Sequence, residues 1–247
     1  MTQYNNVWYD IANTFYIFSA EENIKLMNSS ILSHTDGLIF DIDGTLWDST
    51  PIVARAWNEY LTRIGHPELS VTADILKTVF GQTLPDIARK LFPGFPEDEQ
   101  MHMITKCCDA EHDALYKTPA PLFEGLTDVL PLLSHRYPLF IVSNCQAGYI
   151  ELFLEVTGLS PLFRDHLCPG DTGVAKAANI HTIASRHSLQ HPVYIGDTQG
   201  DLNACKDAGV PFVYASYGFG TADTPDAVIK RPADLPSLFL IAGKGLS

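Results

Sequence analysis

Short apolar runs recur along the chain, separated by longer segments whose apolar residues have helical spacing. The runs at 38–40, 138–142, 192–195 and 211–214 are continuous and brief, which is typical of strands buried on both faces of a sheet. A further short strand is predicted near 166–168. Helices are predicted at 125–135, 148–157, 175–187, 201–208 and 235–242. This alternation predicts an α/β protein with a Rossmann-like parallel sheet and right-handed crossovers.

Residues 51–118 interrupt the alternation, because they contain no strand pattern. Thr50 and Pro51 are predicted as the N-cap and first residue of a helix that ends near residue 65. Further helices are predicted around 71–79, 84–91 and 97–115. The segment is therefore expected to be an all-helical insert.

Three parts of the chain follow from this pattern. The α/β core is expected from 37–50 and 119–247, with 51–118 inserted into it. Residues 1–36 form an N-terminal extension, whose aromatic positions could make an amphipathic helix. A second methionine, Met27, leaves open whether the natural start lies there.

The composition of the chain argues against some classes of binding partner. Its 247 residues carry a formal charge of −13, which argues against nucleic acid, because that partner needs a basic stripe. The same charge would not steer an anionic substrate, so any phosphate ligand needs a local cation. The sequence has no apolar run of membrane-spanning length. Its five scattered cysteines include no Cys-x-x-Cys, which favours reduced thiols in a cytoplasmic protein. A monomer and a homodimer both remain open.

Two aspartates, Asp41 and Asp43, directly follow the first predicted strand. Residues two apart on a strand share a face, so both carboxylates are expected near one point at its C-terminal end. Gly44 lets the backbone turn away from this point. Neighbouring carboxylates repel unless a cation or a shared proton intervenes, which favours a catalytic pair. The alternative is that one caps a turn while the other is merely solvated.

Polar residues also follow two other predicted strands, Ser143 and Asn144 after one and Asp197 after another. Ligands of open α/β sheets bind outside the carboxyl ends of the strands, so these side chains are expected to gather there. Helix capping is the alternative for each of them. Ser143 and Asn144 would cap one helix, Asp197 and Thr198 the next, and Asp201 would be an ordinary acid of the first helical turn.

Lys176 is the only lysine between Lys117 and Lys206, and it opens a predicted helix, where its charge opposes the helix dipole. A solvated surface lysine is the alternative. Nearby carboxylates would give a cation a reason to lie there, and a hard ion such as Mg²⁺ suits oxygen ligands.

These segments carry a family resemblance. The chain resembles the haloacid dehalogenase superfamily, in the subgroup with a helical cap inserted after the first strand, over residues 37–215. The matching residues are Asp41-Ile-Asp-Gly-Thr with Asp48-Ser49 downstream, Ser143, Lys176, Gly196-Asp-Thr-x-x-Asp201 and Asp207-Ala-Gly-Val-Pro.

The resemblance implies a role for each catalytic residue. Asp41 is expected to be the nucleophile that becomes an aspartyl phosphate, and Asp43 the general acid and then the base for water. Ser143 and Lys176 are expected to hold the transferring phosphoryl oxygens. Thr45, Asn144 and Gln82 are expected to contact substrate.

The resemblance also implies a Mg²⁺ site. Asp41, the backbone carbonyl of Asp43, and Asp197 are expected to hold the ion, with Asp201 as a further ligand or an orienting group.

The expected function is a Mg²⁺-dependent phosphatase acting on a small phosphorylated metabolite. Related enzymes that cleave carbon–halogen bonds lack an acid at the position of Asp43. Small-acid phosphatases of the subgroup often carry a basic residue before the cap glycine, where this chain has Val79 and Phe80, which weakens an assignment to phosphoglycolate. Lys77 nearby is expected to be an ordinary helix-end residue.

Two alternatives stay open. A sugar-phosphate mutase of the same family would return the phosphoryl group to its substrate, although Thr45 matches the hydrolytic members better. A non-catalytic binding protein on the same fold would be expected to have lost a catalytic position, and the sequence shows no such loss.

Overall fold

The computed structural model describes Leu32 and residues 34–239. The predicted N-terminal helix, the question of Met27 and the end of the last predicted helix lie outside the described residues.

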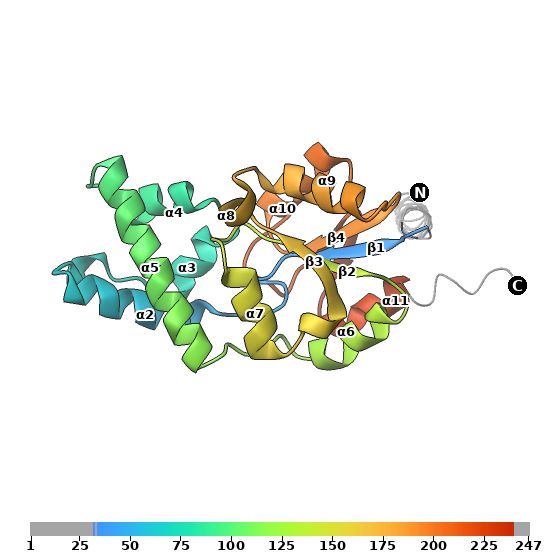
Figure 1. Ribbon diagram of the computed structural model, residues 1–247, viewed down its shortest axis with the longest axis horizontal. Coiled ribbons are helices and arrows are strands. Elements are labelled where there is room, and N and C mark those ends of the chain that lie inside the picture. Colours follow the sequence, from blue (N-terminus) through green and yellow to red (C-terminus); the bar gives the residue numbers. More distant parts are fainter. Residues whose placement is uncertain (1–31, 33, 240–247) are drawn as a thin grey trace, which may run out of the picture.

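The described residues form one six-stranded parallel sheet with helices on both faces, which confirms the predicted Rossmann-like α/β class (Figure 1). The strand order is β3-β2-β1-β4-β5-β6, with β1 in the interior of the sheet. The bounds are β1 (Gly37–Phe40), β2 (Leu139–Val142), β3 (Phe163–Leu167), β4 (Pro192–Gly196), β5 (Phe212–Ala215) and β6 (Ala227–Ile229). The sequence pattern placed β3 too late along the chain and missed β6, whose three residues are too few to show a period.

Alternate residues of β1 face two separate hydrophobic cores. Leu38 and Phe40 pack with one cluster and Ile39 with the other, and all three are fully buried. The first core includes residues of α6 (Leu126–Ser134), α7 (Tyr149–Thr157) and α11 (Leu235–Phe239), and the second includes residues of α9 (Lys176–Arg186) and α10 (Gln199–Ala208). A short helix, α8 (Pro169–Thr172), follows β3. Burial on both faces explains why β1 is a continuous apolar run.

The segment between β1 and α6 contains four α-helices, which we call the helical insert (Figure 1). They are α2 (Thr50–Arg63), α3 (Ala73–Val79), α4 (Leu84–Leu91) and α5 (Glu97–Lys117), with a 3₁₀ turn at 67–69. The predicted N-cap of α2 was wrong by one position. Thr50 is already helical, and its backbone N–H and hydroxyl both donate to Asp48 Oδ1, at 3.1 Å and 2.5 Å.

The helical insert contacts the core beside the carboxyl ends of the strands. Asn144 Nδ2, after β2, donates to the carbonyl of Gly81 in the α3–α4 loop at 2.9 Å. Lys77 Nζ lies 2.8 Å from Asp48 Oδ2. The insert therefore closes over the edge of the sheet where the predicted site residues are.

The five cysteines all belong to the described residues, where each is buried and free. No helix between residues 34 and 239 has the length and apolar character needed to cross a membrane.

Candidate active site

The turn after β1 is built around one carbonyl. Ile42 O accepts from the backbone N–H groups of Thr45 and Leu46 at 3.1 Å and 2.7 Å, which curls the chain back on itself. Gly44 has a φ of +86°, and a Cβ there would lie 2.1 Å from Asp197 Oδ2. A residue with a side chain would therefore be strained and would also clash. Glycine thus lets the first strand's turn approach the carboxylate that follows β4.

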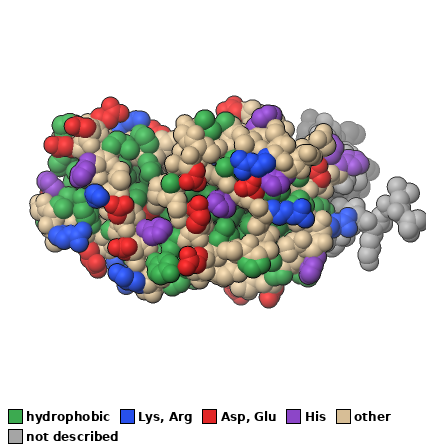
Figure 2. Space-filling model, viewed as in Figure 1, with side chains coloured by type: hydrophobic (Ala, Val, Ile, Leu, Met, Phe, Trp, Pro, Cys, Tyr) green, Lys and Arg blue, Asp and Glu red, His purple; other side chains and the backbone are tan. Residues whose placement is uncertain are grey.

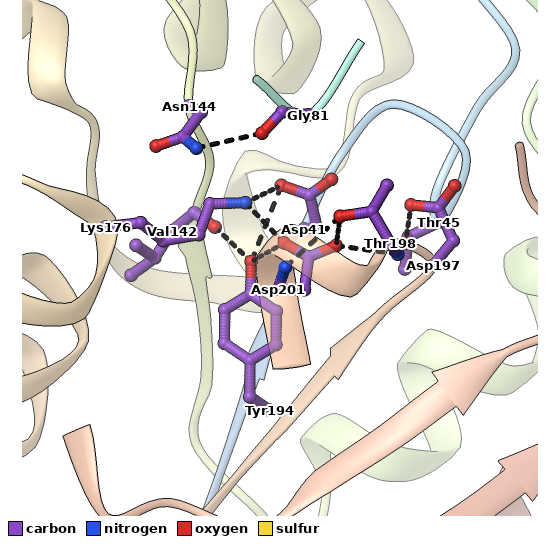
Figure 3. Close-up of polar contacts among 10 residues, drawn as sticks. All are labelled: Asp41, Thr45, Gly81, Val142, Asn144, Lys176, Tyr194, Asp197, Thr198 and Asp201. Carbon is purple, nitrogen blue, oxygen red and sulfur yellow. Dashed lines mark hydrogen bonds and ion pairs between the residues drawn. The ribbon is translucent and has the colours of Figure 1, made fainter. Parts of the chain in front are cut away.

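Three aspartates from distant parts of the chain meet beside this turn (Figure 3). Asp41 follows β1, Asp197 follows β4 and Asp201 lies in the first turn of α10, and one carboxylate oxygen from each lies within 4.8 Å of the others. Each of the three residues is at most 1% exposed. The predicted gathering of Asp41, Asp197 and Asp201 at the edge of the sheet is what the structure shows.

Lys176 joins two members of this cluster. Its Nζ lies 2.8 Å from Asp41 Oδ1 and 2.6 Å from Asp201 Oδ1, and its side chain is only 3% exposed (Figure 3). The alternative of a solvated surface lysine is therefore wrong. Lys176 begins α9, and the ion pairs offset its unfavourable position at the helix dipole's positive end.

Asp197 and Asp201 are each fixed by local hydrogen bonds. Asp197 Oδ2 accepts from the backbone N–H of Phe219 at 2.7 Å, and its Oδ1 accepts from the Thr45 hydroxyl at 3.3 Å. Asp201 Oδ2 accepts from the backbone N–H and the hydroxyl of Thr198 at 3.0 Å and 2.7 Å, and Thr198 caps α10. One carboxylate oxygen of Asp201 thus belongs to the capping box of α10, and the other contacts Lys176.

The charges of this cluster do not balance within the protein. Burial raises the pKa of Asp41 and that of Asp197, with repulsion from Asp201 adding to both, whereas Lys176 lowers them. Burial alone would lower the pKa of Lys176, but Asp201 and Asp41 outweigh it and raise the pKa. One lysine cannot neutralise three buried carboxylates. This oxygen-rich, anionic donor set fits a hard divalent cation.

The carboxyl group of Asp43 belongs to a different hydrogen-bond network. Its Oδ1 accepts from the Ser49 hydroxyl at 2.5 Å, the Tyr149 hydroxyl at 2.9 Å and Trp47 Nε1 at 3.0 Å. Burial raises the pKa of Asp43 to about 7, although the Ser49 hydrogen bond opposes the rise. Asp43 lines the same pocket as Asp41 while its side chain stays outside the acidic cluster. The two aspartates are thus held in separate environments.

Ser143 and Asn144 lie at the pocket rather than serving as a helix cap. The N-cap of α7 is Gly148, and no side chain caps this helix. The alternative that Ser143 and Asn144 cap the helix is therefore wrong. Ser143 is 5% exposed, and its hydroxyl lies close enough to Asp41 to lower the pKa of that carboxyl. Asn144 Nδ2 reaches across to Gly81. Gln82 also lines the pocket, but its Nε2 donates to Thr78 O at 3.0 Å.

Several neighbours of the site could not be found from the sequence. The Tyr194 hydroxyl donates to Val142 O at 2.6 Å and lies 3.5 Å from Asp41 Oδ1, although Tyr194 is a mid-strand residue that looks like ordinary core. Tyr149 and Trp47 were missed for the same reason, since large buried aromatics carry no signal of a polar partner.

Comparisons with known proteins identify the family of the chain. The profile of the haloacid dehalogenase-like hydrolase family matches residues 38–215. A phosphoglycolate phosphatase of Rhodobacter capsulatus is 28% identical over 189 residues, which cover 74% of this chain and 84% of the relative. Another, of Photobacterium profundum, is 27% identical over 222 residues, covering 83% and 96%. A crystal structure from Haemophilus somnus, titled a predicted phosphoglycolate phosphatase, has a TM-score of 0.73 at 20% identity, covering 83% and 98%.

The protein has an α/β fold with a buried acidic cluster at the carboxyl edge of its parallel sheet. The chain belongs to the haloacid dehalogenase-like hydrolase family, because the family profile matches well over half of it. The predicted family and the predicted hydrolase class are confirmed, and phosphatases are among the relatives.

Replacing Lys176 with methionine should destabilise the fold strongly, because Asp41 and Asp201 would lose their buried cation. Breaking such a pair costs about 3–5 kcal/mol, measurable by urea unfolding at neutral pH without divalent metal. Lys106→Met, which removes an exposed ion pair with Asp109, is the control and should unfold like the wild type. An unchanged midpoint for Lys176→Met would show that the pairing carries no stability.

Proposed function

We propose that the protein is a Mg²⁺-dependent phosphatase that hydrolyses a small phosphorylated metabolite through an aspartyl-phosphate intermediate. The observation that carries the proposal is the arrangement around Asp41, a buried carboxylate held by Lys176 beside two further carboxylates. A fourth carboxyl, that of Asp43, lines the same pocket as Asp41. This combination provides a nucleophile, an acid–base group and a place for a cation.

Mg²⁺ would be held by Asp41, Asp197 and the backbone carbonyl of Asp43, with Asp201 as a further ligand or an orienting group. The donor set fits the ion, because the three carboxylates are buried and exceed the positive charge that the protein supplies. When bound, the ion would offset the repulsion between these carboxylates and the phosphate dianion.

Asp41 would attack phosphorus with one carboxylate oxygen, and the bond from phosphorus to the leaving alcohol would break. Asp43 would give its proton to the departing oxygen and then take a proton from the water that hydrolyses the aspartyl phosphate. Its raised pKa supports this role, because a carboxyl that titrates near neutral pH can serve as acid and then as base. The products are the free alcohol, inorganic phosphate and regenerated Asp41.

The other site residues would bind and orient the ester. Lys176 would neutralise phosphoryl oxygens while holding Asp41, and Ser143 would donate a hydrogen bond to them. Thr45, Asn144 and Gln82 would contact the substrate from the turn after β1, the end of β2 and the α3–α4 loop. Hydrogen bonds to Asp197, Gly81 O and Thr78 O, respectively, already orient their side chains.

The helical insert would act as a cap over the site. We place the cap at residues 51–118 and the core at 37–50 and 119–247, with 1–36 as an extension. The hydrogen bond from Asn144 to Gly81 O supports a closed position that excludes water while the ester is attacked.

The charge distribution supports a small-molecule substrate rather than nucleic acid. On the face drawn in Figure 2, Lys and Arg side chains are dispersed among acidic ones and form no continuous stripe. The named relatives support phosphate-ester chemistry.

We place the enzyme in the cytoplasm, as a monomer or a homodimer.

Asp41→Asn should abolish turnover of p-nitrophenyl phosphate with Mg²⁺, because an amide cannot form the aspartyl phosphate. The assay is release of inorganic phosphate, which a mutase would not produce in stoichiometric amounts. Asp74→Asn, which changes an exposed acid of α3, is the matched control and should retain wild-type turnover. Full activity of Asp41→Asn would remove the proposed nucleophile.

Asp43→Asn should slow esters with poor leaving groups far more than p-nitrophenyl phosphate. General acid catalysis contributes about 10²–10⁴-fold, and a nitrophenolate needs no proton to depart. Comparing kcat/KM for an alkyl phosphate and for p-nitrophenyl phosphate measures the difference. Equal losses on both substrates would contradict the acid role and indicate a positioning one.

A further inference from the structure

A pocket between the helical insert and the core extends from the nucleophile into the insert. Asp41, Asp43 and Ser143 line it together with residues of the helical insert. The remaining wall comes from α2, the α3–α4 loop, α4, α5 and the segment after β2. Six residues of this wall bear on its specificity: Trp57, Phe80, Gln82, Glu111, Asn144 and Gln146.

Glu111 is a buried carboxyl in this wall that the proposed chemistry does not use. It is 4% exposed, and each of its oxygens accepts a hydrogen bond, Oε2 from Trp57 Nε1 at 2.7 Å and Oε1 from Gln146 Nε2 at 2.6 Å. Donors on both oxygens stabilise the ionised form. Burial, however, raises the pKa of Glu111 to about 8, with repulsion from Asp43 adding to the rise. A carboxyl in this position lacks a positive partner.

The wall around Glu111, away from Ser143, offers acceptors rather than cationic donors. No Lys, Arg or His is among the described residues that line it. The side-chain nitrogens of Gln82, Gln146 and Asn144 each already donate to a protein acceptor. Because Asn144 Nδ2 faces Gly81 O, its Oδ1 is buried with no hydrogen-bond partner. A carboxylate on the leaving group would therefore meet the Glu111 carboxyl and an unpaired acceptor, with no Lys, Arg or His among the described lining residues to balance its charge.

Two aromatic rings complete the wall beside Glu111. The Trp57 and Phe80 ring centroids lie 6.4 Å apart with the planes tilted by 56°. Aromatic faces together with a carboxylate are the groups that recognise an ammonium, through cation–π attraction and charge-assisted hydrogen bonds.

We infer that Glu111 determines specificity for a leaving alcohol that carries an amine, so that the substrate is the phosphate ester of a small amino alcohol without a carboxylate. The ammonium would donate to Glu111 and Asn144 Oδ1, while its carbon atoms contact Trp57 and Phe80. This inference rests on the proposed phosphatase activity and names the substrate class of that site.

The test compares three two-carbon esters that differ only in their terminal group: 2-aminoethyl phosphate, 2-hydroxyethyl phosphate and 2-phosphoglycolate. Full-length enzyme with Mg²⁺ should show the highest kcat/KM for the amine and the lowest for the carboxylate, at least about tenfold apart, as expected for one charge-assisted hydrogen bond. Equal or higher kcat/KM for 2-phosphoglycolate would overturn the inference. This comparison uses the wild type and does not depend on how a variant folds.

Glu111→Gln should lower the ratio of kcat/KM for the amine over the hydroxyl ester by about tenfold, because it removes the charge and keeps the shape. Asp113→Asn, an exposed acid on the same helix, is the matched control and should keep the wild-type ratio. A folded Glu111→Gln enzyme with an unchanged ratio would contradict the inference. Turnover of p-nitrophenyl phosphate by the wild-type enzyme distinguishes failure of the proposed phosphatase from failure of the amine specificity. If the wild type does not hydrolyse this ester, the phosphatase proposal is refuted. If it hydrolyses the ester but prefers the carboxylate substrate, only the inference about Glu111 is refuted.

Discussion

The structure depends on one charge arrangement, in which a single buried lysine is shared by two of three buried aspartates. Lys176 contacts Asp41 and Asp201, whereas Asp197 is held by a backbone N–H and the Thr45 hydroxyl. Burying three carboxylates around one ammonium leaves uncompensated negative charge in a region of low dielectric. Such a cluster is costly in a protein without ligands and becomes favourable when a divalent cation occupies it.

The parallel sheet makes this arrangement possible. Adjacent strands β1 and β4 end at the same edge, so residues more than 150 positions apart in the sequence come within contact distance. Gly44 permits the closest approach, because any side chain there would collide with Asp197. The helical insert then covers this edge and brings Glu111 and Trp57 to the same pocket as the nucleophile. The core would thus supply the phosphoryl chemistry and the insert the choice of alcohol.

Much of the fold and of the acidic site could be predicted from the sequence, because strands buried on both faces produce continuous apolar runs and the polar residues stand at their ends. Lys176 was recognisable from its scarcity and its unusual position on a helix. The capping alternative for Asn144 failed because its partner, Gly81 O, is brought close only by tertiary packing. Glu111 was missed for a similar reason. Within α5 it is one acid among several, and only the packing of the insert on the core buries it.

The dependence of phosphate binding on a cation at the acidic cluster is tested most directly by calorimetric titration of Mg²⁺ into the enzyme, with and without orthophosphate. We expect one Mg²⁺ per chain and mutual strengthening, so that each ligand raises the affinity for the other by the same factor. Phosphate that binds equally well in Mg²⁺ and in EDTA would contradict the central claim, because the acidic cluster would then accept an anion without the cation.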